Sequence, residues 1–265
     1  MVKFSNIKVV FGLNTPLENF ALNGVDLDIK NGEFLTVIGS NGAGKSTLLN
    51  AIAGYVPLHS GKIEIDGKDI SKLAVHERSR VMGRVFQDPL AGTCDRLTIE
   101  ENMALAAKRG KSRSYFKSGV DSDNKEEFRK ILKRLDLGLE NRLEDIIGLL
   151  SGGQRQAVSL LMATLSPMKI LLLDEHTAAL DPKTQEFVMR LTQEIVEEFS
   201  LTTIMITHSM KQALEYGNRM IMLHQGRIAF DLNKEEKKGK TVNDLLDYFT
   251  QLKGEKIEDD ALLLD

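Results

Sequence analysis

The sequence contains very little cysteine, tryptophan or proline: one Cys, no Trp and five Pro in 265 residues. The lone Cys94 excludes an internal disulfide and is typical of a reducing compartment. No uninterrupted apolar run approaches the roughly 18–20 residues that a membrane-spanning helix needs. Residues 1–5 lack the apolar core of a signal peptide. We therefore expect a soluble, cytoplasmic chain, in which any work at a membrane would require another subunit to span it.

An excess of charge of one sign is also absent, because the formal net charge is −3. This balance gives no global reason to expect a nucleic acid as partner. The length of 265 residues allows one large domain or two small ones, with a substantial buried core.

Most of the chain alternates between short apolar segments and helical periodicity. The expected strands are 34–38, 170–173, 202–206 and 220–224, and the expected helices are 45–53, 183–199, 210–216 and 242–252. Residues 34–38 are continuously apolar, as in a strand buried on both faces. Strands that alternate with helices predict a mostly parallel, doubly wound sheet.

Two regions depart from this alternation. Near the N-terminus, strand-like segments at 8–11 and 25–29 precede Asp66-Gly67, a strong signal for a two-residue hairpin. Between about residues 89 and 165 the pattern becomes helical, with apolar residues at helical spacing around 99–106, around 128–135 and after Ser151. This helical block is predicted to be an insertion into the sheet domain.

A phosphate-binding loop follows the strand at 34–38. Its residues, Gly39-Ser40-Asn41-Gly42-Ala43-Gly44-Lys45-Ser46, match G-x-x-x-x-G-K-[ST] in full. The glycines let backbone N–H groups surround a phosphate at the start of the next helix. Lys45 is expected to reach the β and γ phosphates, and the Ser46 hydroxyl to bind Mg²⁺. Thr47, in the first turn of that helix, is placed with the nucleotide-binding residues. The preceding strand and following helix argue against a chance match.

Two carboxylates, Asp174 and Glu175, follow the apolar strand at 170–173. Open α/β sheets bind ligands at the carboxyl ends of their strands. Asp174 is therefore a candidate Mg²⁺ ligand, and Glu175 a candidate to orient or activate an attacking water. Taken alone, the pair could equally be solvated carboxylates at a strand end. Its position beside a phosphate loop favours the functional interpretation.

With Leu150-Ser151-Gly152-Gly153-Gln154 added, the chain from Lys3 to about Asp231 resembles the ATP-binding subunit of ATP-binding-cassette (ABC) transporters. The resemblance implies an α/β fold: a P-loop NTPase core with a mostly parallel sheet, an N-terminal antiparallel β subdomain and an inserted α-helical subdomain. The implied division is a core of residues 1–88 and 166–235, a helical signature subdomain of 89–165, and a C-terminal helix with an acidic tail, 236–265.

The resemblance also assigns roles along the chain. Gln87 is similar to the glutamine that touches magnesium and senses the permease, and His208 to the histidine that contacts the γ-phosphate. Glu175 takes the place of the catalytic glutamate, and residues 179–181 resemble the D-loop. Phe11 is the candidate for stacking on adenine, although a packing or exposed role is as plausible. His176 replaces a proline common in the family, either as a tolerated change or as a source of pH dependence.

The stretch Ser151-Gly152-Gly153-Gln154 resembles the family signature. Ser151 suits a helix N-cap, and the glycines leave first-turn amides open to an anion. On these residues alone, an ordinary helix start is the better interpretation. The resemblance implies a head-to-tail dimer with a second copy of the chain, in which each signature caps the γ-phosphate of ATP held by the other copy.

Three functions are compatible with this sequence: an ATPase that energises transport, a soluble ABC ATPase not coupled to transport, and a nucleotide-binding regulator without turnover. Intact Lys45, Glu175 and His208 argue against the regulator. We expect an importer with a separate transmembrane permease and, indirectly, an extracellular solute-binding protein. The chain would then lie on the inner face of the membrane. Residues 86–102 are similar to ATPases of amino-acid-type importers, including aromatic ones. The basic run 108–117 could meet the permease or anionic lipid, but a solvated loop is favoured.

Overall fold

The computed structural model describes residues 1–110 and 122–253, and these fall into two compact units. The first unit combines residues 1–78 with the C-terminal part from Phe199 onward, and the second comprises Ser79–Glu198. Each unit is described by itself. The three-part division expected from the sequence stays a prediction.

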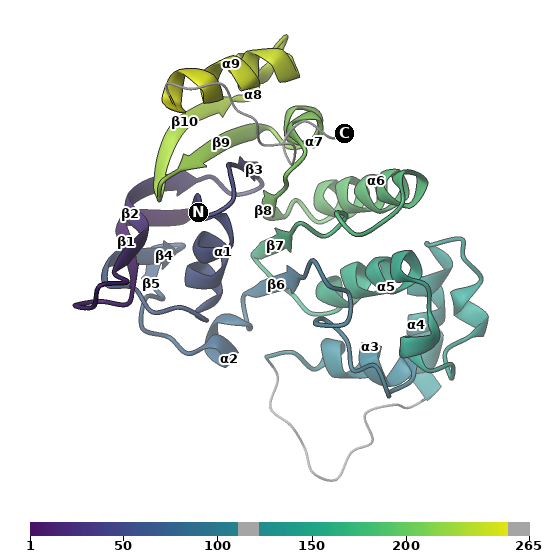
Figure 1. Ribbon diagram of the computed structural model, residues 1–265. Helices are drawn as coiled ribbons and strands as arrows, with labels where there is room; N and C mark the ends of the chain where they lie inside the picture. Colours follow the sequence, from purple (N-terminus) through teal and green to yellow (C-terminus); the bar gives the residue numbers. More distant parts are fainter. Residues whose placement is uncertain (111–121, 254–265) are drawn as a thin grey trace. The chain divides into compact units, whose positions relative to one another are not determined.

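The first unit contains two sheets and the helices that pack on them (Figure 1). Its elements are β1 (Val2–Phe11), β2 (Asn19–Ile29), β3 (Phe34–Ile38), α1 (Lys45–Ala53), β4 (Ser60–Ile65), β5 (Lys68–Asp69), α2 (Val75–Arg78), β8 (Thr202–Ile206), α7 (Met210–Glu215), β9 (Arg219–His224), β10 (Arg227–Asn233), α8 (Lys234–Lys237) and α9 (Val242–Lys253). Strands β2-β1-β4-β5 form the expected antiparallel sheet. In the second sheet, β9, β3 and β8 are parallel and β10 pairs antiparallel with β9.

The second unit is largely helical around one parallel strand pair. Its elements are β6 (Met82–Val85), α3 (Ile99–Ala107), α4 (Ser122–Lys133), the 3₁₀ turns η1 (Leu139–Asn141) and η2 (Ile147–Leu149), α5 (Gly152–Thr164), β7 (Ile170–Asp174) and α6 (Pro182–Glu198). Strands β6 and β7 pair in parallel. The helices expected between residues 89 and 165 are α3, α4 and α5. Among the described residues, none of the helices is long and apolar enough to cross a membrane.

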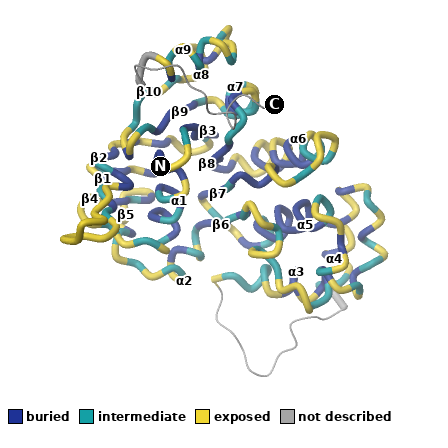
Figure 2. Tube along the Cα trace, in the orientation of Figure 1, coloured by how far each residue is buried: buried dark blue, intermediate teal, exposed yellow. Residues whose placement is uncertain are grey.

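The core of each unit follows the apolar pattern of the sequence (Figure 2). All five residues of β3 are buried, as expected for a strand covered on both faces. The β4–β5 hairpin turns at Asp66-Gly67, where both residues have positive φ, 50° and 76°, as a type I′ turn requires. The segments 8–11 and 25–29 are only the ends of longer strands, because β1 and β2 pair along almost their whole length.

The C-terminal helices pack onto the first unit. On α9, Leu245 and Phe249 are fully buried in a cluster with residues of β3, α7 and β9. On α8, the Lys237 ammonium donates to the carbonyls of Tyr216 and Gly217 (2.7 and 3.1 Å), at the end of α7. Burial lowers the pKa of Lys237 to about 8. Residues 236–253 are therefore part of the folded core, and 254–265 lie outside the described residues.

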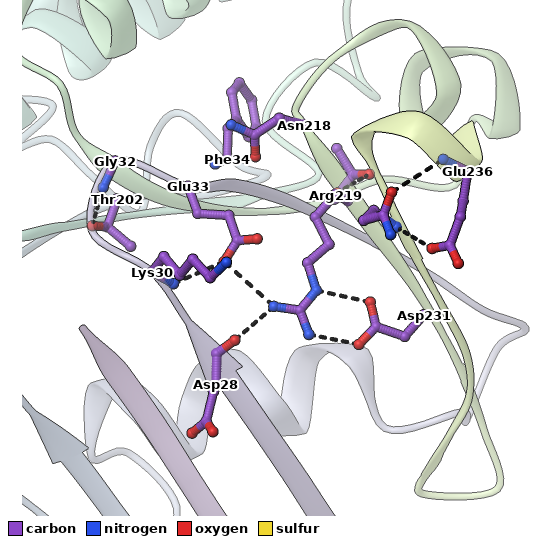
Figure 3. A network of polar contacts seen from close by, with 12 residues as sticks. Asp28, Lys30, Gly32, Glu33, Phe34, Thr202, Asn218, Arg219, Asp231 and Glu236 are labelled. Carbon is purple, nitrogen blue, oxygen red and sulfur yellow. Dashed lines mark hydrogen bonds and ion pairs between the residues drawn. The ribbon is translucent and has the colours of Figure 1, made fainter. Parts of the chain in front are cut away.

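An arginine joins β9 to β10 and to the end of β2 (Figure 3). The Arg219 guanidinium forms two hydrogen bonds to Asp231, 2.8 and 2.6 Å, and also pairs with Glu33. It donates further to the carbonyl of Asp28 at 2.6 Å. A bidentate arginine–carboxylate pair is directional as well as strong. This network fixes the antiparallel edge strand β10 against the parallel strands.

Candidate functional site

The phosphate loop connects β3 to α1, where the sequence predicts it. Gly39, Gly42 and Gly44 all have positive φ, 151°, 76° and 104°. A Cβ atom at Gly39 would lie 2.4 Å from the carbonyl oxygen of Leu223, and one at Gly44 would lie 2.4 Å from that of Ala21. These two positions therefore require glycine for space as well as for conformation. Gly42 faces open space.

Lys45 extends across this loop. Its Nζ donates to the carbonyls of Gly39 and Ser40, at 2.7 and 3.2 Å, and its side chain is buried. The N-cap of α1 is Gly44, which has no side chain to cap the first-turn amides. Uncapped amides and a nearby ammonium together form a site for an anion. Of the other expected residues, Asn41 and Ser46 are exposed, Thr47 is half-buried and Ala43 is buried.

His208 lies at the same strand edge as the loop. Strands β3 and β8 pair in parallel with Val37 opposite Ile206, so Gly39 and His208 each come two residues after a matched pair. The Thr207 amide donates to the Val37 carbonyl at 3.2 Å, which extends the ladder to the residue before His208. His208 is half-buried, so its imidazole is partly accessible at the edge that carries the loop.

Phe11 is the last residue of β1 and is 45% exposed. This exposure excludes the core role that the sequence left open. Stacking on adenine and a simple surface position both remain compatible with the structure.

In the second unit, Asp174 ends β7 and is paired with an arginine that the sequence did not single out. The Arg84 Nη2 atom lies 2.6 Å from the Asp174 Oδ2 atom, and both side chains are 13% exposed. Arg84 lies on β6, whose polar residues carried no motif signal. Asp174 is the carboxylate that could hold a metal here. Among residues 1–110 and 122–253, no cluster of three or more His, Cys, Asp or Glu side chains is suited to a metal ion.

Glu175 follows Asp174 in an unusual conformation. Its φ is +47°, in the left-handed region that non-glycine residues rarely adopt, and its side chain is 8% exposed. Such backbone outliers cluster at functional sites and cost on the order of 1–3 kcal/mol. Six other described non-glycine residues share a positive φ, so the outlier supports a functional Glu175 only together with its position after Asp174. No sequence pattern predicts it.

His176 is buried and fixed by a hydrogen bond. Its Nε2 atom lies 3.1 Å from the Thr192 hydroxyl, and that hydroxyl donates to the Val188 carbonyl at 2.8 Å. The hydroxyl therefore accepts from the imidazole N–H. Burial lowers the pKa of His176 to about 4. The ring is neutral at physiological pH, which favours a tolerated replacement of proline over a pH-dependent group.

Gln87 is exposed and comes two residues after β6. The carbonyl of its neighbour Phe86 accepts from Nε2 of Gln156 at 3.1 Å. Gln156 belongs to α5, the helix that begins at the signature, and its side chain is fully buried. The backbone next to Gln87 is thus attached to the signature helix.

The signature begins α5 with a capping box. The Ser151 hydroxyl accepts from the Gln154 amide at 3.3 Å, and the Gln154 side chain accepts from the Ser151 amide at 3.2 Å. Ser151 and Gly152 are exposed. A Cβ at Gly153 would lie 2.2 Å from a methyl carbon of Thr184 on α6, whereas Gly152 has no such conflict. Gly153 thus has a packing role, and Gly152 leaves the helix start open.

The basic run at 108–117 is described only as far as residue 110. Arg109 donates to the carbonyls of Ala163 and Ser166, 2.8 and 3.0 Å, at the end of α5. This arginine is therefore engaged within the unit rather than offered to a partner, and burial lowers its pKa.

Comparisons with known proteins agree with this geometry. Residues 22–178 match the family described as ABC transporter. The tyrosine transport ATP-binding protein of Clostridioides difficile is 44% identical over 94% of this chain and 98% of that protein. A phosphonates import ATP-binding protein of Alcaligenes faecalis is 37% identical over 80% of this chain and 76% of that protein.

Solved structures give the same result. A dimeric ATP-binding cassette bound to ADP and phosphate after hydrolysis is 30% identical, with a TM-score of 0.75 over 88% of this chain and 99% of that one. A cassette in its ADP conformation is 26% identical, with a TM-score of 0.78 over 96% of this chain and 99% of that one. The chain therefore belongs to the ABC transporter family, as an ATP-binding and ATP-hydrolysing subunit that energises transport through a separate permease.

Proposed function

We propose that this chain is the ATPase of an importer for an amino-acid-type solute, with tyrosine or a related aromatic amino acid as the first candidate. The observation that carries the proposal is the 44% identity to a tyrosine transport ATP-binding protein over nearly the full length of both chains. Relatives named for phosphonates and methionine are 37% and 32% identical, over smaller shares of each chain. No comparable observation favours a soluble ATPase uncoupled from transport. The proposed location is the inner face of the membrane, against the permease.

For the first unit, we assign the nucleotide contacts to the loop and its neighbours. Residues 39–47 hold the phosphates of ATP, and Lys45 exchanges its present bonds to loop carbonyls for bonds to phosphate oxygens. His208 contacts the γ-phosphate and Phe11 stacks on adenine. The uncapped start of α1 and the shared edge of β3 and β8 support these roles.

Magnesium is assigned to Ser46, Gln87 and Asp174, together with the phosphates. Mg²⁺ prefers oxygen ligands and is usually bound by one or two carboxylates plus substrate phosphates, so a single aspartate fits this chemistry. When bound, the ion neutralises charge on the β and γ phosphates. The Asp174 carboxylate at the end of β7 is of the required type.

Glu175 is assigned to orient the attacking water and to accept its proton. Its carboxylate is largely buried and follows directly on Asp174. A buried carboxylate loses less freedom than an exposed one when it orients a water molecule. The signature residues 151–154 are assigned to the γ-phosphate held by a second copy in a head-to-tail dimer, because the start of α5 is exposed at Ser151 and Gly152.

The substitution Glu175→Gln tests the catalytic assignment. We expect ATP binding to persist, steady turnover to fall by at least about a hundredfold, and an ATP-bound dimer to accumulate. Glu194→Gln, on the exposed face of α6, is the matched control and should leave turnover unchanged. Phosphate release and size-exclusion chromatography measure the two effects. Normal turnover in Glu175→Gln would remove this residue from its role.

The solute is tested separately, in proteoliposomes that contain this chain and its permease. We expect ATP turnover to rise when the matching solute-binding protein is loaded with tyrosine, and not when methionine or a phosphonate is supplied instead. Stimulation by one of the other two solutes alone would overturn the amino-acid assignment or its aromatic refinement, while leaving the ATPase assignment intact.

A further inference from the structure

Arg84 and Asp174 are brought together by the pairing of β6 and β7. In this parallel pair Arg84 lies opposite Leu172, and Asp174 is two residues further along β7. Residues two apart on a strand project from the same face of a sheet. The guanidinium therefore reaches diagonally to the carboxylate at the strand end, and the two groups approach to 2.6 Å.

A second contact holds the guanidinium in place. The Arg84 Cζ atom lies 4.6 Å from the centre of the Phe86 ring, a cation–π distance. Phe86 is itself held through its carbonyl by Gln156 of α5. The arginine thus lies between an anion and an aromatic ring, and that ring belongs to Phe86, the residue before Gln87. None of the site assignments above gives this arginine a role.

The positive charge of Arg84 affects the binding of a metal ion at Asp174. A guanidinium on one carboxylate oxygen neutralises the aspartate, and it also repels a divalent cation that approaches the same carboxylate. Arg84 and Mg²⁺ are therefore in competition for Asp174. With only 13% of each side chain exposed, solvent screens this competition less than it would at the surface.

We propose that Arg84 is an internal counter-cation of Asp174, which it must release in part when Mg²⁺ and nucleotide bind. Arg84 then sets the Mg²⁺ concentration at which nucleotide is retained. It acts through Asp174 and is a positioning residue rather than a catalytic one. The inference rests on the proposed function, because it requires Asp174 to be a metal ligand.

A competing role makes the opposite prediction. If Arg84 only holds the Asp174 carboxylate in position for the metal, its removal would raise the Mg²⁺ concentration that nucleotide binding needs. If Arg84 competes with the metal, its removal lowers that concentration. The sign of the change therefore separates the two roles.

The test is calorimetric titration with the non-hydrolysable analogue β,γ-imido-ATP, over a series of free Mg²⁺ concentrations buffered with EDTA. In Arg84→Met, which removes the charge but keeps an apolar stem against Phe86, we expect the half-saturating Mg²⁺ concentration to fall about five- to tenfold. In Arg84→Lys, which keeps a positive charge, the half-saturating Mg²⁺ concentration should fall less than in Arg84→Met. Affinity measured in EDTA alone should change little in either variant.

Three further variants make the outcome unambiguous. Arg142→Met removes an arginine of the same unit whose carboxylate partner is Asp145, at 2.7 Å, so the Mg²⁺ dependence should stay native. Arg84→Gln repeats the loss of charge should Arg84→Met fail to fold. Asp174→Asn should raise the half-saturating Mg²⁺ concentration, because one of the assigned ligands loses its charge. A native dependence in Asp174→Asn would refute the metal assignment itself. A raised Mg²⁺ requirement in Asp174→Asn, together with an unchanged or raised requirement in Arg84→Met and Arg84→Gln, would overturn the proposed role of Arg84 and leave the metal assignment in place.

Discussion

Glu175 and His176 are neighbours in the sequence with opposite relations to the site. Glu175 has a left-handed backbone and a buried carboxylate next to Asp174, whereas His176 is directed to Thr192 on α6. The sequence identifies both positions by their place after the strand, but only the structure separates their roles. A proline at position 176 would be uncharged, as the buried imidazole of His176 is. His176 is thus a packing residue that retains one polar contact.

The buried imidazole of His176 predicts a pH dependence of stability. Its pKa falls from 6.5 in the unfolded chain to about 4 when folded, so the unfolded state binds the extra proton first. The contribution of His176 to the free energy of unfolding is fully present above pH 6.5 and is lost as the pH falls towards 4. Between pH 7 and 5 the loss is about 2 kcal/mol.

Urea unfolding at these two pH values measures the effect. The free energy of unfolding of His176→Leu should fall less between pH 7 and 5 than that of the native chain. His59→Leu, at an exposed position, is the control and should keep the native pH dependence. Equal losses in native and His176→Leu proteins would show that His176 titrates normally in the folded state.

Helices α3 and α5 each begin with a capping box, and this permits a matched comparison. Thr98 and Glu101 cap α3 as Ser151 and Gln154 cap α5. Alanine at either N-cap should cost about 1 kcal/mol of stability, because a first-turn amide loses its acceptor. Only α5 carries the signature.

Ser151→Ala should therefore differ from Thr98→Ala in function and not in stability. We expect both variants to bind ATP as monomers and to unfold at similarly lowered temperatures. Only Ser151→Ala should lose ATP-dependent dimerisation and most hydrolysis. Loss of monomer binding in Ser151→Ala, or equal loss of hydrolysis in both variants, would contradict an intermolecular role for the signature.

At the scale of whole elements, the sequence predicts most of this fold. Strands β3 and β8 and helix α1 have the expected bounds, because apolar runs and flanking glycines are strong local signals. Strands β6 and β10 are absent from the prediction. Strand β6 is four residues long and contains Gly83 and Arg84, and β10 is half-exposed along most of its length, so neither shows an apolar pattern.

In the candidate site, too, some residues can be predicted from local sequence motifs, whereas others depend on the tertiary structure. The motif residues of the phosphate loop, the strand end and the signature are readable from the chain. Arg84 and Gln156 could not be found, because their importance depends on strand register and on packing against α5. The left-handed Glu175 is likewise set by tertiary structure, since no local propensity favours it.

For the whole molecule, the head-to-tail proposal predicts complementation between two inactive variants. Lys45→Met removes the phosphate-binding group, and Ser151→Arg blocks the signature. A mixed dimer contains one site with an intact loop from one copy and an intact signature from the other. A mixture in equal amounts should recover up to about a quarter of native turnover per chain, because half the dimers are mixed and each has one intact site.

Phosphate release after mixing the two purified variants measures this recovery. Each variant alone should remain inactive at every concentration. A mixture no more active than its components would argue that each chain completes its own site, or that both sites must be intact together. Where turnover is recovered, adding Glu175→Gln to the Ser151→Arg chain should abolish it, because the intact loop of the mixed dimer belongs to that chain.

The positive φ of Glu175 also bears on how well an inactive protein survives in a cell. Glycine adopts this conformation without steric cost, so a chain with glycine in place of Glu175, the proposed catalytic residue, would keep its fold and relieve local strain. Steady-state abundance follows stability rather than turnover. Inactive copies would therefore accumulate to the same level as active ones. In a two-chain assembly, they would pair with active copies.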